Sequence, residues 1–534
     1  MARNVLYYGD NLNVLRTCIK DDSVHLIYLD PPFNSQQVYN VFYTEKNGSS
    51  AQSQARAFED TWRWDERAER TYREVVEEGG RISEAIQAFR RMLGECNLTA
   101  YLTMMAPRLA QLRRVLAPAG SIWLHCDPTA SHYLKVLMDA IFGPKSFRND
   151  VIWKRTSAHS DSATCGNSHD NLLLYTKSDQ FTWNKHYQAY DERYVRTHYR
   201  FVDEQGRRFR TGDLTAGGLT GGGYKYEWRG VTRVWRCPKE RMAQLETDGR
   251  IRYTEAGTAE YIRYLDEMPG VPLQDVWQDI PPINPQAKER LGYPTQKPQA
   301  LLERIIQASS NEGDNVLDPF CGCGTSIAAA QKLGRSWIGI DITHVAITLI
   351  KHRLASAFPS GIEYDVVGAP VSVSDAEALA KNDPYQFQWW AVGLVGGRAV
   401  EQKKGADKGI DGRLYFHDEH KGGSTKQIIL QVKAGHAGPA SVRELIGVVE
   451  REKAQLGVLI TMQQSTPAMR SEAAAAGQYK SPWRKEPYPR IQIITIPDLL
   501  AGKRIDYPPP SQVNVTFKKG PKGMKGYERE GRLF

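Results

Sequence analysis

The sequence predicts an α/β protein with a helix-covered parallel sheet, an inserted β-rich segment and a second, smaller α/β unit. Apolar strand-like runs alternate with helical periodicities through residues 1–155 and again through residues 275–365, which is typical of a parallel sheet covered by helices. Between them, residues 156–274 are rich in glycine, aromatic and basic residues, and their helical periodicity is poor. A third alternating stretch occupies residues 383–505 and precedes a basic tail, residues 506–534.

The first part of the chain contains a strand that stops abruptly. An apolar run at residues 24–29 ends at Asp30-Pro31-Pro32, the profile of a buried parallel strand that runs into a loop. Leucine and methionine then recur at helical spacing over residues 98–116, which predicts an amphipathic helix before the next strand.

The composition sets outer bounds on the class of protein. With 534 residues, 41% hydrophobic and 25% charged, the chain suggests about two to four globular domains. We read no signal peptide and no membrane span in it. Seven scattered cysteines favour a reducing cytoplasm over a disulfide framework. The net charge of +9 suits a polyanionic partner, although basic proteins of many other kinds share it.

A glycine-rich turn follows the strand at residues 315–317. The segment Asp318-Pro-Phe320-Cys-Gly322-Cys-Gly324-Thr325 leads into an alanine-rich helix. Glycines in such a turn let the backbone pass close to a bound ligand. Asp341, at the tip of the next predicted strand, suits an acidic group that accepts hydrogen bonds from a ribose.

Three motifs together resemble a known family. Asp-Pro-Pro-Phe at 30–33, Pro-Thr-Gln-Lys-Pro at 294–298 and Asp-Pro-Phe-Cys-Gly-Cys-Gly-Thr at 318–325 resemble the motifs of the amino-methyltransferases of bacterial DNA modification, including the modification subunits of type III systems. The resemblance covers most of residues 1–358, and the order of its motifs is that of the β-class.

This resemblance implies a Rossmann-like, S-adenosylmethionine-dependent methyltransferase in which residues 156–274 form the target-recognition region. It also implies that the cofactor is bound by Asp10, Thr295, Lys297, Asp318, Phe320, Gly322, Gly324, Thr325 and Asp341. Structural alternatives remain open for Asp10, which would suit a helix cap, and for Lys297, which would suit a solvated charge.

The tetrapeptide at 30–33 carries the expected catalytic chemistry. The lone pair of an exocyclic amine is delocalised into the base, so acceptors aimed at the amine hydrogens favour its nucleophilic form. The Asp30 carboxylate and the Pro31 carbonyl would supply these acceptors, and Pro31 and Pro32 would fix the loop. Phe33 would stack on a base extruded from the duplex.

The target base and the role of the chain retain alternatives. Aspartate at the first motif position is usual among the adenine N6 enzymes of this family, so adenine in duplex DNA is expected, with cytosine N4 as the alternative. A DNA-recognition protein with an inactive nuclease domain is a second reading. RNA methylation is a third, which the large insert and the C-terminal unit disfavour.

The C-terminal unit contains a possible metal site of a different kind. Asp411 precedes one predicted strand, and Gln431-Val-Lys433 lies on the next. Asp411 and the Gln431 side chain would hold Mg²⁺ through oxygen atoms, and Lys433 would activate a water. Residues 385–500 resemble the Mrr-like branch of the PD-(D/E)xK nucleases, but Gln386 and Gln388 lie where family members often carry glutamate.

The combined expectation is a restriction-modification or phage-defence protein. Its expected parts are a catalytic part, a target-recognition insert, a cofactor-binding part, an Mrr-like nuclease domain and a basic tail, at residues 1–155, 156–274, 275–365, 383–505 and 506–534. Its expected partners are double-stranded DNA and an additional restriction-system subunit, with no membrane. The oligomeric state stays open, with a dimer as one candidate.

Overall fold

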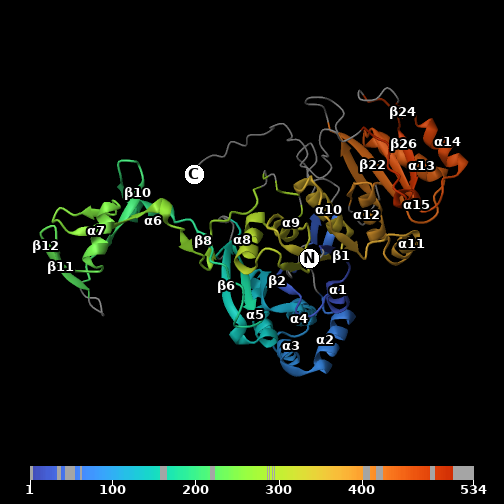
Figure 1. Ribbon diagram of the computed structural model, residues 1–534. Coiled ribbons are helices and arrows are strands. Elements are labelled where there is room, and N and C mark those ends of the chain that lie inside the picture. The colour runs from blue at the N-terminus through green and yellow to red at the C-terminus, as the bar shows by residue number, and fades with distance from the viewer. Residues whose placement is uncertain are drawn as a thin grey trace, which may run out of the picture. The chain divides into compact units, whose positions relative to one another are not determined.

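The computed structural model describes two compact units of this chain (Figure 1). The described residues are 4–32, 38–41, 55–59, 63–156, 165–216, 223–284, 287, 289–291, 293, 295–400, 409–416, 425–481 and 487–508. Unit 1 comprises Met1–Asn184 and Asp275–Phe534, and unit 2 comprises Lys185–Gln274. No helix among these residues is both long enough and apolar enough to cross a membrane.

A nine-stranded sheet forms the centre of unit 1. Its strands, in spatial order, are β16 (Val276–Trp277), β6 (Phe147–Lys154), β7 (His169–Thr176), β5 (Leu116–Cys126), β2 (Val24–Leu29), β17 (Asn315–Asp318), β18 (Ser336–Asp341), β1 (Val5–Tyr8) and β19 (Asp365–Val367). The pairs from β5 to β19 are all parallel, whereas β7 runs antiparallel to both β5 and β6. The predicted parallel sheet is therefore present with one reversed strand.

Helices cover both faces of this sheet, which is why its central strands are apolar on both sides. The helices are α1 (Asn11–Cys18), α2 (Glu66–Glu78), α3 (Gly80–Leu93), α4 (Asn97–Val115), α5 (Pro128–Phe142), α8 (Gln299–Ser309), α9 (Thr325–Lys332) and α10 (His344–Ala357). In Figure 1, α4 and α5 lie on one side of β2, and α9 and α10 lie on the other. A further hairpin pairs β3 (Val38–Val41) with β4 (Ala55–Glu59).

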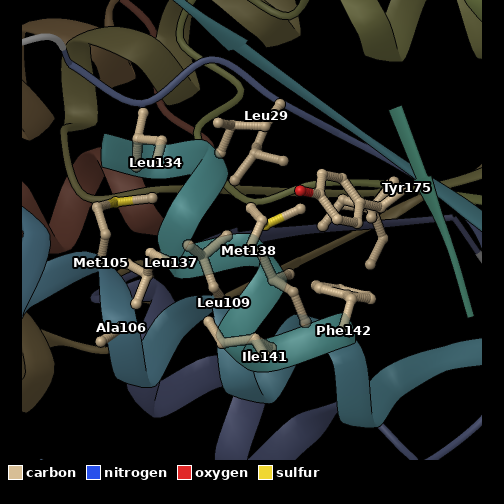
Figure 2. Close-up of a cluster of buried hydrophobic side chains, with 14 of the residues drawn as sticks. Leu29, Met105, Ala106, Leu109, Leu134, Leu137, Met138, Ile141, Phe142 and Tyr175 are labelled. Atoms are coloured by element: carbon tan, nitrogen blue, oxygen red, sulfur yellow. The ribbon is translucent and has the colours of Figure 1, made fainter. Parts of the chain in front are cut away.

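One continuous apolar core joins α4 and α5 to the sheet (Figure 2). Met105 and Leu109 of α4 pack with Leu137 and Met138 of α5, all buried, beneath Leu29 of β2. The predicted helix at residues 98–116 is confirmed as α4. This core therefore holds the end of β2, at Leu29, directly before Asp30.

The inserted unit is shorter than the sequence suggests. We expected it to span residues 156–274, but β7 lies within that range and pairs with β5 and β6 of the main sheet. The compact unit begins at Lys185. Strand β7 is apolar like its partners in the main sheet, and Leu172, Leu173 and Leu174 are all buried.

Unit 2 is an irregular β-rich module. Its elements are β8 (Tyr187–Gln188), α6 (Glu192–His198), β9 (Phe201–Val202), β10 (Arg208–Asp213), β11 (Tyr224–Trp228), β12 (Val231–Trp235), α7 (Lys239–Thr247), β13 (Ile251–Tyr253), β14 (Ala259–Tyr264) and β15 (Val271–Pro272). A small core around Trp228, Trp235 and Met242 holds it together. Arg207 stacks over Tyr264 at 3.7 Å and pairs with Asp266 at 2.9 Å, so part of the basic charge of this unit is neutralised internally.

The C-terminal part of unit 1 forms a second, five-stranded sheet. Its strands, in spatial order, are β20 (Arg398–Ala399), β21 (Gly412–Phe416), β22 (Lys426–Lys433), β23 (Leu456–Thr461) and β26 (Ile491–Thr495). Around it lie α11 (Val373–Asn382), α12 (Pro384–Leu394), α13 (Pro439–Arg451), α14 (Pro467–Ala475), α15 (Ile496–Leu500) and the pair β24 (Gln478–Tyr479) and β25 (Tyr488–Pro489). The predicted second α/β unit is thus present.

Candidate active site

Four acidic residues meet at one edge of the main sheet. Strands β2, β17, β18 and β1 are neighbours and run parallel, so their carboxyl ends lie along the same edge. Asp30 follows β2, Asp318 ends β17, Asp341 ends β18 and Asp10 follows β1. The carboxyl edge of a parallel sheet is where α/β proteins usually bind ligands.

A cavity of about 230 Å³ opens at this edge, and we call it the strand-end cavity. It gathers most of the residues predicted from sequence: Asp10, Asp30, Pro32, Thr295, Lys297, Asp318, Phe320, Gly322, Thr325 and Asp341. Pro31 and Gly324 are not among the described residues that line it. Phe33 lies outside the described residues.

The catalytic carboxylate of the prediction is held by a lysine. Lys297 Nζ lies 2.5 Å from Asp30 Oδ2, and the two side chains are only 13% and 16% exposed. The sequence analysis left open whether Lys297 is a solvated surface charge, and this burial argues against that reading. A buried pair of opposite charges costs desolvation, which hydrogen bonding and attraction must offset.

Asp10 is tied to the surrounding elements as well as to the cavity. Its Oδ1 accepts from the backbone N–H of Leu12 at 2.9 Å, which caps α1. Its Oδ2 accepts from the buried guanidinium of Arg108 at 2.9 Å. Arg108 also donates to Asn11 Oδ1 at 2.7 Å. Burial lowers the pKa of the Arg108 guanidinium, although the negative charge of Asp10 acts to raise it. The helix-cap alternative is therefore correct for Asp10, and the same residue also lines the cavity.

Two buried carboxylates, Asp318 at the start of the glycine-rich turn and Asp341 at the end of β18, have raised pKa values. Burial raises the pKa of Asp318 to about 7, although the Ser326 hydroxyl and the Phe320 N–H donate hydrogen bonds to it. Burial likewise raises the pKa of Asp341 to about 6. Asp341 accepts from Gly322 N at 3.0 Å and from Thr343 N at 2.9 Å, so it also braces the turn.

Gly324 has a packing role that the sequence did not reveal. We expected both glycines to make room for a ligand. Gly322 lines the cavity, but an added Cβ at Gly324 would lie 2.7 Å from Ile350 Cγ1 on α10, and its φ is +72°. This glycine therefore allows the turn to approach a helix, where a side chain would collide.

A buried polar chain supports the strand that carries Asp30. The Tyr28 hydroxyl lies 2.9 Å from His125 Nδ1, and His125 Nε2 lies 3.0 Å from Asp170 Oδ2. Burial acts to raise the pKa of Asp170, but the hydrogen bond and charge of His125 leave it below its usual value. Burial also raises the pKa of Tyr28 well above 10, so a neutral tyrosine faces the cavity two residues before Asp30.

Several cavity residues escaped the sequence analysis. They are Tyr28, Arg67, Met104, Arg108, Tyr293 and Gln296. Arg108 offered a signal, because it is a charged residue within a run of apolar residues on α4, between the buried Met105 and Leu109. Tyr28 and Gln296 lie beside or within motifs already recognised, whereas Arg67 and Met104 come from helices whose proximity to the site only the fold reveals.

The C-terminal residues Asp411, Gln431 and Lys433 also come together. Asp411 Oδ2 accepts from Val432 N at 2.7 Å, and Gln431 is 1% exposed. Lys433 Nζ lies 3.5 Å from Glu444 Oε2 on α13. Of the two expected metal ligands, Asp411 and Gln431, only Asp411 carries a carboxylate. Within the part of the chain that the structure describes, no three His, Cys, Asp or Glu side chains are placed to hold a metal ion, so the expected Mg²⁺ site is not supported.

Comparisons with protein families match both α/β regions. The family described as DNA methylase matches residues 24–352. A second family, described as NACHT-associated inactive Restriction Endonuclease 1, matches residues 385–501. The expected nuclease resemblance therefore falls on a family whose description calls it inactive.

Similar proteins include DNA methyltransferases of restriction systems. The type II methyltransferase M.EcaI of Enterobacter cloacae is 28% identical over 66% of this chain and 69% of its own length. The StyLTI Mod subunit of a type III enzyme of Salmonella typhimurium is 28% identical over 62% of this chain, which spans half (50%) of that relative. TTHA0409 of Thermus thermophilus, solved with S-adenosyl-L-methionine, aligns with 69% of this chain and 99% of its own at 17% identity and a TM-score of 0.33.

Replacement of Gly324 by alanine tests the packing of the turn. Because the Cβ would meet Ile350 at 2.7 Å, we expect Gly324→Ala to lower the free energy of unfolding by about 1–3 kcal/mol more than a matched control. The control is Gly313→Ala, which has a similar φ of +83° but no neighbouring atom within 4 Å. Equal losses in urea denaturation would show that backbone strain alone matters at this position.

Proposed function

The chain belongs to the DNA methylase family, and on that premise we propose that it transfers a methyl group from S-adenosylmethionine to the N6 amine of adenine in duplex DNA. The observation that carries this proposal is the strand-end cavity, where Asp30 and the glycine-rich turn are brought together. Relatives named as type II methyltransferases and as a type III Mod subunit support a role in restriction-modification. By the same likeness, the chain would act with an additional restriction subunit.

The side chains of the cavity fit this cofactor. Asp341 offers acceptor oxygens for ribose hydroxyls, since each carboxylate oxygen accepts more than one hydrogen bond. The Lys297 ammonium suits the carboxylate of an amino-acid group. Burial raises the pKa of Asp318 and Asp341, because it disfavours their ionised forms. A positively charged ligand would stabilise those ionised forms and therefore suits this cavity. When bound, S-adenosylmethionine would supply an electrophilic methyl group on a sulfonium centre.

The chain itself would position and activate the amine. The Asp30 carboxylate and the Pro31 carbonyl accept hydrogen bonds from the amine hydrogens, which favours a localised lone pair on nitrogen and stabilises the positive charge that develops there. Lys297, which lies 2.5 Å from Asp30, holds the carboxylate in place before the base arrives. The neutral Tyr28, held by His125 at 2.9 Å, fixes the strand end behind it.

The choice of adenine rests on Asp30 as the first residue of its motif. Cytosine N4 methylation remains the alternative, because both reactions place an exocyclic amine against the same acceptors. Unit 2, Lys185–Gln274, is the proposed target-recognition module, with exposed basic side chains for phosphates and bases.

For the C-terminal unit we propose a nuclease fold without cleavage activity. The matched family is described as inactive, and the Lys433 ammonium is paired with Glu444 at 3.5 Å. Asp411 directs one carboxylate oxygen to the Val432 N–H and provides the only carboxylate of the two expected metal ligands.

Removal of the Asp30 carboxylate tests the methyl-transfer proposal. We expect Asp30→Ala to lower the methyl-transfer rate by about 10²–10³-fold, because an acceptor used in the transition state is lost. Asp30→Asn, which keeps the shape, should show a comparable loss. Tritium transfer from labelled cofactor to duplex DNA measures the rate, and the exposed Glu78→Ala variant is the control. Wild-type rates in both Asp30 variants would sink the assignment.

The raised pKa of Asp341 predicts pH-dependent cofactor binding. At pH 6 part of the carboxyl is protonated, since its pKa is about 6. Ribose hydroxyls and a cationic cofactor favour the ionised form, so binding lowers this pKa, releases protons near pH 6 and tightens as pH rises from about 5 to 7. Titration calorimetry in buffers of different ionisation enthalpy measures the release. Asp341→Asn should abolish this contribution, and proton uptake by the wild type at pH 6 would contradict it.

A cleavage assay tests the inactive nuclease fold. We expect no Mg²⁺-dependent cleavage of plasmid DNA, whether methylated or not, and no difference between the wild type and Lys433→Ala, because the described metal ligands are too few. Cleavage by the wild type that disappears in Lys433→Ala would overturn this proposal and restore the endonuclease interpretation.

A further inference from the structure

Helix α12 belongs to the C-terminal part of unit 1, around the five-stranded sheet. It lies directly against helix α10, which covers the nine-stranded sheet. The approach is close: a Cβ built on Gly393 of α12 would lie 2.5 Å from Thr348 Oγ1 of α10. Such proximity requires a glycine at this position. The two helices therefore form a packed interface within unit 1.

The same interface continues into the wall of the strand-end cavity. Phe387 and Trp390 of α12 belong to one buried apolar cluster with Val345 of α10 and with Tyr293 and Cys323. Tyr293 and Cys323 line the cavity. Since a close-packed core transmits displacements between its members, helix α12 supports a wall of the cofactor site.

A specific hydrogen bond links the two parts at the cofactor turn. The Gln386 side-chain oxygen accepts from the backbone N–H of His344 at 3.1 Å. His344 is the first residue of α10, so this N–H has no partner within the helix. The three residues just before it, Asp341, Ile342 and Thr343, all line the cavity.

The hydrogen bond from His344 N to Gln386 is one of several that hold the Asp341–Thr343 turn. Asp341 accepts from Thr343 N at 2.9 Å, and the Thr343 hydroxyl accepts from Ala346 N at 3.2 Å. Gln386 satisfies the N–H between those two. The His344 ring stacks on Tyr8 with the ring centroids 3.7 Å apart, next to Gly9 and Asp10 of the cavity wall.

We propose that Gln386 is a positioning residue of the methyltransferase: the C-terminal unit holds the Asp341–Thr343 turn in the geometry that binds S-adenosylmethionine. This inference rests on the proposed function. It also gives a use to a residue that departs from the nuclease pattern, since the glutamine serves the neighbouring active site. The C-terminal unit is then a structural part of the cofactor site, whether or not it handles DNA.

The test is equilibrium binding of S-adenosylmethionine to the full chain without DNA, by titration calorimetry. Gln386→Ala should raise the Kd by about 3–10-fold, the effect of one hydrogen bond. Gln386→Glu keeps an acceptor oxygen and should bind within about twofold of the wild type at pH 8. Gln464→Ala, an exposed glutamine in the same unit, is the matched control and should leave the Kd unchanged.

A second pair of variants tests the helix contact independently of Gln386. Gly393→Ala should also raise the Kd, because its Cβ would press on Thr348. Gly447→Ala lies on α13 with no atom within 4 Å of the added Cβ and is its control. Wild-type affinity in both Gln386→Ala and Gly393→Ala would overturn the inference and would leave the proposed function standing.

The remaining outcomes separate the inference from the proposed function. A Gln386→Glu variant as weak as Gln386→Ala would indicate a general packing role and would overturn the inference. A wild-type chain that does not bind S-adenosylmethionine would overturn the proposed function, and the inference with it.

Discussion

The parallel pairing of β2, β17, β18 and β1 is the constraint on which the site depends. Asp10 and Asp30 come from the first strands of the chain, whereas Asp318 and Asp341 come from strands about 300 residues later. Only the backbone register of neighbouring parallel strands brings their carboxyl ends to one edge. Because of that pairing, the strand-end cavity is lined by Tyr28, Lys297 and the glycine-rich turn together. A change that shifted β2 relative to β17 would separate Asp30 from the glycine-rich turn.

The concentration of acidic groups at one edge has an electrostatic cost that the surrounding residues offset. Arg108 lies 2.9 Å from Asp10, and Lys297 lies 2.5 Å from Asp30. Asp318 and Asp341 have hydrogen-bond donors rather than a cation against them, and burial raises their pKa to about 7 and about 6. The cavity is thus prepared for a ligand that carries positive charge and hydroxyl donors. The affinity proposed for S-adenosylmethionine and its expected pH dependence would then have one physical origin.

Local patterns in the sequence predicted the elements, and long-range packing decided their use. The apolar run before Asp30 and the glycine-rich turn were read correctly, because burial on both faces and a tight strand-to-helix turn leave local signatures. Strand β22, which carries Gln431 and Lys433, was found for the same reason. By contrast, β7 was placed in the insert, because nothing in an apolar run tells which sheet it joins. The packing of Gly324 against Ile350 and the bond from Gln386 to His344 depend on contacts between distant segments, which no local pattern contains.

The central claim is that this edge of the sheet methylates the N6 amine of adenine in DNA. The most direct measurement is modification-sensitive long-read sequencing of plasmid DNA from a host that lacks adenine methylation and expresses this chain, beside the same host with Asp30→Ala. The account predicts N6-methyladenine at one short sequence motif with the wild type and none with the variant. Methyl groups on cytosine N4 would contradict the choice of base. Unmodified DNA from a well-expressed, folded chain would contradict the claim itself.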